Sequence, residues 1–148
     1  MIRKRRKGQS LVEMAVIFPF FLLVVVGGII DFGFTFFNFL TLQQIANDTA
    51  RYAAEGNGVS GITDQGAIQT YANSKRPTWW TGQFTVHPRE ILTLTEAGAA
   101  QAVKVILSYE SPTYTPFYQT MLGAISGTRS IRLAVIASYQ IPQYVATR

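Results

Sequence analysis

The sequence LVEMAVIFPFFLLVVVGGII spans residues 11–30 and carries one charged side chain, that of Glu13. Wound as an α-helix at about 1.5 Å per residue, this run covers the roughly 30 Å hydrocarbon core of a bilayer. Lipid offers no partner to backbone polar groups, so such a segment must be helical. Pro19 removes one hydrogen bond of the helix and predicts a local bend. The sequence therefore predicts a membrane-spanning helix near the N-terminus.

Glu13 is the unexpected residue of this run. A charged side chain at the centre of a membrane helix costs about 2.5–3.5 kcal/mol on insertion-derived scales. Glu13 lies three positions into the run, where its carboxylate can reach the lipid headgroups. A positive charge near Glu13 would lower this cost, and the residues before it could supply one.

Five consecutive cations precede the run: Arg3, Lys4, Arg5, Arg6 and Lys7. They are five of the 13 lysines and arginines, and the other eight are balanced by eight aspartates and glutamates. The excess charge is thus confined to the N-terminus, which argues against a nucleic-acid partner. By the positive-inside rule these cations predict an N-terminus in the cytoplasm and a C-terminal domain on the far side of the membrane.

A secretory signal peptide is the competing interpretation of this segment. Its apolar region runs for about 7–15 residues and ends at a small-residue cleavage site. Here the apolar run continues into DFGFTFFNFL at residues 31–40, so we expect a retained, single-pass anchor. Asp31 is expected to mark the outer interface or to pair with a partner subunit. Aromatic rings suit that depth, and we expect a membrane-interface belt of Phe32, Phe34, Phe36, Phe37 and Phe39.

The helix is predicted to continue beyond the membrane, from about Ser10 to Glu55. An apolar stripe recurs at three- and four-residue steps, at Leu42, Ile45, Ala46, Thr49 and Ala53. Asp48 and Arg51 are spaced for a weak ion pair on the polar side. Gly56 supplies a residue suited to a left-handed helix end. Gly27, Gly28 and Gly33 are either surfaces for a second helix or ordinary membrane-helix composition.

The remaining residues predict a small α+β domain with an antiparallel sheet. A short helix is expected over 64–74 with Asp64 as its N-cap. Alternating apolar residues predict strands over 102–110 and 130–140, with weaker strands over 83–87 and 91–95, the last of them possible as an irregular edge. Residues 111–127 form an apolar connection. We expect it to be a short helix or a loop that packs on the sheet edge, touches the membrane surface or docks a partner. Trp79 and Trp80 are expected in the core, with membrane contact as the alternative.

Four segments follow from these boundaries: a basic leader (1–8), a transmembrane helix (9–31), an amphipathic extension (32–55) and an extracytoplasmic domain (56–148). A prepilin peptidase requires a short basic leader, a glycine before the scissile bond and an apolar helix that presents it. Gly8 and Gln9 meet this requirement. Cleavage between them makes Glu13 the fifth residue of the mature chain and creates an ammonium one helical turn from its carboxylate, which would keep Glu13 ionised.

The motifs GQSLVE, FP, GIIDFG and QQIANDTARYAA resemble the TadE-like pseudopilins of Flp (tight adherence) type IV pilus systems, closely over residues 7–54 and by pattern beyond them. The resemblance implies a pilin-like fold and cleavage after Gly8, with Glu13 as the carboxylate that sets subunit register. It also implies a minor component of pilus assembly in the bacterial inner membrane. Its partners would be the prepilin peptidase, other pilin or pseudopilin subunits, the assembly platform and the lipid bilayer. The alternative is an unprocessed single-span anchor that displays a small binding domain.

Catalytic and metal-binding signals are weak. The chain has no cysteine, which excludes disulfides and thiol nucleophiles. His87 is the one histidine and lacks acidic or hydroxyl residues at a spacing typical of a triad. The acidic residues of the outer domain lack metal-ligand spacing, and no phosphate-binding glycine loop follows a strand. We therefore expect no enzymatic activity, no cofactor and no metal.

Overall fold

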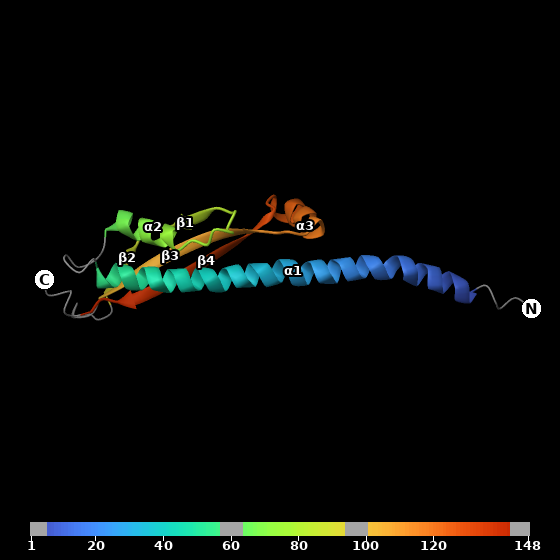
Figure 1. Cartoon of the computed structure of the whole chain (residues 1–148), viewed down its shortest axis with the longest axis horizontal. Coiled ribbons are helices and arrows are strands. Elements are labelled where there is room, and N and C mark those ends of the chain that lie inside the picture. The colour runs from blue at the N-terminus through green and yellow to red at the C-terminus, as the bar shows by residue number, and fades with distance from the viewer. Residues whose placement is uncertain (1–5, 57–63, 94–100, 143–148) are drawn as a thin grey trace, which may run out of the picture. The chain divides into compact units, whose positions relative to one another are not determined.

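The computed structural model describes residues 6–56, 64–93 and 101–142. Its elements are α1 (Arg6–Glu55), α2 (Gln65–Ser74), β1 (Phe84–Val86), β2 (Glu90–Thr93), β3 (Gln101–Pro112), α3 (Pro116–Ser126) and β4 (Ser130–Gln140) (Figure 1). These elements form two compact units. The first combines α1 up to Phe34 with Thr113–Arg129, and the second combines Thr35–Pro112 with the chain from Ser130 onward.

Helix α1 confirms the predicted continuous helix, which includes Pro19 without a break. It ends at Glu55, and Gly56 follows with a φ of 68°, the left-handed conformation expected of a glycine at a helix end. On the polar side, Arg51 pairs with Glu55 at 2.8 Å, one turn away, and not with Asp48 as the spacing suggested. This hydrogen bond raises the pKa of Arg51 above its ordinary value.

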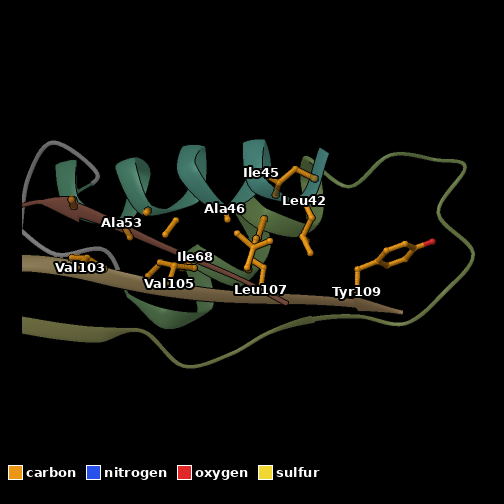
Figure 2. Close-up of a cluster of buried hydrophobic side chains, with 14 of the residues drawn as sticks. Leu42, Ile45, Ala46, Ala53, Ile68, Val103, Val105, Leu107 and Tyr109 are labelled. Atoms are coloured by element: carbon orange, nitrogen blue, oxygen red, sulfur yellow. The ribbon is translucent and has the colours of Figure 1, made fainter. Parts of the chain in front are cut away.

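The core of the second unit lies between α1, α2 and the sheet. The predicted stripe of α1 is buried in full: Leu42, Ile45, Ala46, Thr49 and Ala53. Figure 2 shows side chains of α1 pointing toward Val103, Val105 and Leu107 of β3. Complete burial of an aliphatic side chain contributes about 1.5–3 kcal/mol, so this contact stabilises the unit substantially. The structure therefore confirms a long apolar helix packed on a small antiparallel sheet.

Strand β3 is the centre of the four-stranded sheet. It pairs antiparallel with β4 over its length, in a register that places Val105 opposite Ala137. Along its other edge it pairs antiparallel with β1 and then β2. The alternation predicted for β3 is confirmed, because Val103, Val105, Leu107 and Tyr109 are all buried. In β4 the predicted face is buried at Val135 and Ala137, and Tyr139 of the same face is exposed.

Strands β1 and β2 follow one another along the same edge of β3, separated by a bulge. Val86 lies opposite Leu107 and Glu90 lies opposite Lys104, so the edge holds one more residue than β3 over this interval. Pro88 lies in this gap, where its missing N–H costs no ladder bond. Gln65 of α2 bonds the backbone of the bulge: its side chain accepts from the Arg89 N–H at 3.0 Å and donates to the His87 carbonyl at 3.3 Å.

Helix α2 begins as predicted. Asp64 is its N-cap, and the carboxylate accepts from the Gly66 N–H at 3.0 Å. Ile68 and Ala72 of this helix are buried. The cap thereby aligns α2 so that one face closes the core and Gln65 reaches the bulge of the edge strand.

A polar contact joins α1 to the sheet inside the second unit. Asn38 is buried on α1, donates to Ser111 Oγ at 3.0 Å and accepts from Trp80 Nε1 at 2.9 Å. Trp80 stacks on Tyr109 and belongs to the core, as predicted. The same prediction is wrong for Trp79, which is 58% exposed and stacks on Phe37. The two residues lie in a turn in which the Trp80 N–H donates to the Pro77 carbonyl at 3.2 Å, and their indole rings leave this turn toward different surroundings.

Candidate membrane and assembly surface

The first turns of α1 hold the predicted cleavage site. Gly8 and Gln9 lie within the helix that begins at Arg6, and Glu13 follows Gln9 by about one helical turn. Arg3, Lys4 and Arg5 lie outside the described residues, whereas the backbone of Arg6 and Lys7 belongs to α1. Cleavage after Gly8 and the topology set by these cations stay predictions.

Glu13 lies on an exposed side of α1 among apolar residues. A shallow depression on this side is lined by Ser10, Glu13, Met14, Ile17, Phe18 and Phe21, which recur at helical spacing. The run is exposed from residue 10 to residue 23, with Leu11, Ile17 and Leu23 among its open side chains. Helix α1 is long and apolar enough to cross a membrane. A carboxylate on such a surface can reach either the headgroup layer or a charged group of another helix.

Asp31 occupies a site that its sequence position did not suggest. Its side chain is only 3% exposed and binds the segment before α3. One carboxylate oxygen accepts from the Tyr114 N–H at 2.7 Å, and the Thr115 N–H lies at 3.2 and 3.3 Å from the two oxygens. The Thr115 hydroxyl also donates to this carboxylate. The donors that bind Asp31 in the structure belong to its own chain. Its predicted place at the outer membrane interface stays a prediction, as does the alternative of a partner subunit.

Helix α3 continues from this contact. Thr115 is its N-cap, and Pro116 takes the first helical position, where an N–H is not needed. Gly127 ends the helix with a φ of 72°. A short helix in the 111–127 connection was one of two predicted forms and is confirmed. The negative charge of Asp31 beside its N-terminus also suits the helix dipole.

Two glycines let α3 approach α1 closely. Gly27 and Gly28 are both buried, and a Cβ on Gly28 would stand 2.7 Å from the Tyr118 hydroxyl oxygen. That hydroxyl donates to the Val24 carbonyl at 3.1 Å. The predicted second helix at these glycines is thus α3 of the same chain. A Cβ on Gly33 would meet nothing within 4 Å, so this glycine makes no such contact.

Aromatic contacts extend the packing of α3 on α1. Phe20 meets Phe117 edge-on with ring centroids 6.4 Å apart, and Phe32 meets Tyr118 in the same way at 6.1 Å. Phe34 contacts Tyr114 at 5.0 Å. Of the predicted belt, Phe32, Phe34, Phe36 and Phe37 are exposed, and Phe39 is partly buried against the core.

Several residues of this surface escaped the sequence analysis. Thr115 and Tyr118 were not predicted as partners of α1, because they lie more than 80 positions from Asp31 and Val24. The sequence did contain a signal that could have found this contact: residues 113–128 hold no charged side chain, and neither do residues 14–30 of α1. The structure also brings His87 Nε2 to 3.0 Å from Ser108 Oγ, a contact that the spacing did not suggest.

Comparison with known proteins identifies the N-terminal segment. Residues 8–51 match the model of the family described as TadE-like protein. The match covers most of α1, including Glu13, Asp31 and much of the buried stripe. A search of curated proteins and a search of solved structures each found no match.

Proposed function

We propose that the chain, whose residues 8–51 match the TadE-like protein family, belongs to this family and acts as a minor pilin-like component, a pseudopilin, of tight-adherence (Flp) pilus assembly. The observation that carries the proposal is the coincidence of this match with a membrane-length apolar helix that begins at a basic leader. The α+β domain packed on that helix supports a minor subunit, since the major Flp pilins resemble a bare helix.

In this function the chain is a substrate and not an enzyme. The prepilin peptidase cuts between Gly8 and Gln9 on the cytoplasmic side of the inner membrane, and the domain packed on α1 stays outside. The mature helix then exchanges lipid for neighbouring pilin or pseudopilin helices at the assembly platform. The exposed apolar side of α1 around Glu13 supports this exchange, because it offers both packing area and a charge for alignment.

Intact-mass spectrometry tests the processing step. The protein is purified from cells with and without the prepilin peptidase, and we expect the loss of residues 1–8 only where the peptidase is present. A Gly8→Val variant should stay uncut in both strains, because the added side chain crowds the scissile bond. Gly33→Ala is the matched control, since open space surrounds Gly33. A chain that starts at Met1 in both strains would instead indicate an unprocessed anchor.

A further inference from the structure

Helix α3 exposes apolar side chains in a segment without charge. Residues 113–128 hold no Asp, Glu, Lys or Arg, and Arg129 follows. Ile125 is 77% exposed and Met121 is also exposed. The helix has 11 residues, too few to cross a bilayer and in the range typical of buried or interfacial segments. Exposure of such an apolar surface to water is unfavourable, which indicates that lipid or another molecule covers it.

The polar side chains of α3 are all bonded within the protein. Tyr118 donates to the Val24 carbonyl and Gln119 to the Thr113 carbonyl, at 3.1 and 2.8 Å. Thr120 and Ser126 donate to carbonyls one turn earlier in α3, both at 2.8 Å. Polar groups satisfied in this way are what a lipid environment demands. A protein partner would be expected to use about one hydrogen bond per 100–200 Å² of interface, and these donors are already engaged.

The contacts with α1 also show beside which part of that helix α3 and the preceding segment lie. They fall between Phe20 and Phe34. Residues 21–30 form the C-terminal half of the apolar run, which is the outer half when the basic N-terminus is cytoplasmic. The one charged residue among residues 14–34 is Asp31, and the segment before α3 shields it.

We propose that α3 lies in the outer leaflet of the membrane as a helix that does not span it, with Met121 and Ile125 in contact with lipid. The placement rests on the membrane position of α1 in the proposed function. Asp31 holds the N-terminal end of α3 to α1, and Arg129 returns the chain to the headgroup layer. The membrane-embedded part of the protein is thus a pair of helices of unequal length.

Spin labelling of the full chain in vesicles of phosphatidylethanolamine and phosphatidylglycerol tests this placement. The absence of cysteine allows a single label at Ile125→Cys without further substitutions. Two reference sites bracket the result: Leu23→Cys on the exposed apolar run of α1, and Asn73→Cys on the exposed side of α2. Power saturation then measures collisions of each label with oxygen, which concentrates in lipid, and with a water-soluble nickel chelate.

At Ile125→Cys we expect an oxygen-to-nickel ratio close to that at Leu23→Cys and several-fold above that at Asn73→Cys. A ratio equal to that at Asn73→Cys would place α3 in water and overturn the proposal. Low collision rates with both reagents would indicate a protein partner on α3, which also overturns it. Leu23→Cys reports separately on α1, so failure of the membrane anchor and failure of the α3 placement give different results. Met121→Cys repeats the measurement at a second exposed position.

Discussion

The Asp31 carboxylate is almost completely buried, yet it accepts several hydrogen bonds. An unpaired charge in an apolar environment is strongly unfavourable, whereas a carboxylate that accepts several hydrogen bonds is tolerated. Two backbone N–H groups and one hydroxyl fulfil this need at Asp31. The residue therefore acts as an internal anchor for the segment that starts α3.

Replacing Asp31 with Asn should loosen this anchor. The amide removes the charge and turns one acceptor into a donor that faces the N–H groups of Tyr114 and Thr115. Hydrogen bonds to charged groups contribute about 1.5–3 kcal/mol, so amide exchange at these two positions should accelerate roughly 10- to 100-fold. Asp48→Asn, an exposed Asp on the same helix, is the control. Unchanged exchange at Tyr114 and Thr115 would show that the carboxylate does not hold this segment.

Among the elements, the loop before β1 depends on close contact with β3. A Cβ on Gly82 would stand 1.7 Å from the Glu110 carbonyl oxygen, a backbone atom that cannot move aside. The backbone of the same loop binds β3 where Glu110 N–H donates to the Gln83 carbonyl at 2.9 Å. The glycine is thus required by the packing of the loop on the central strand.

A Gly82→Ala substitution should separate the loop from β3. We expect a loss of stability of several kcal/mol, comparable to overpacking at a rigid site, which costs about 1–3 kcal/mol or more. Thermal unfolding of the detergent-solubilised protein measures the effect. Gly123→Ala in α3 is the control: its Cβ would meet only an Arg129 side-chain atom at 3.9 Å, and alanine favours a helix. Equal melting temperatures for the wild type and Gly82→Ala would contradict the packing argument.

Elements that are defined by contacts between residues close in sequence could be predicted, and contacts between distant residues could not. Helix α1, its buried stripe, the Asp64 cap and strands β3 and β4 followed from local periodicity and capping chemistry. Strands β1 and β2 were predicted more weakly, over 83–87 and 91–95. Their joining into one bulged edge was not predicted, because Gln65 from another element binds the backbone of the bulge at Pro88. The Asp31 contact was missed for the same reason: its partners are distant in sequence and leave no local pattern.

For the whole molecule, the proposed assembly role concerns the exposed side of α1 that carries Glu13. Replacing Glu13 with Leu should leave cleavage and membrane insertion intact, since neither depends on that charge. Piliation, measured as the pilin content of a sheared surface fraction, should fall several-fold, because subunits lose the charge that aligns them. Ser10→Ala on the same side of α1 is the control. Normal piliation in the Glu13→Leu strain would show that the carboxylate does not align subunits and only contacts the lipid headgroups.

The packing of α3 on Gly27 and Gly28 limits the number of other subunits that α1 can contact. Those glycines are places on α1 where another helix could approach closely, and the chain itself occupies them with Thr115 and Tyr118. While α3 stays there, α1 has fewer sides open to neighbours than a bare pilin helix. Such a subunit can pack against fewer neighbouring subunits. This suits a component at the start or the end of a helical array better than one in its middle.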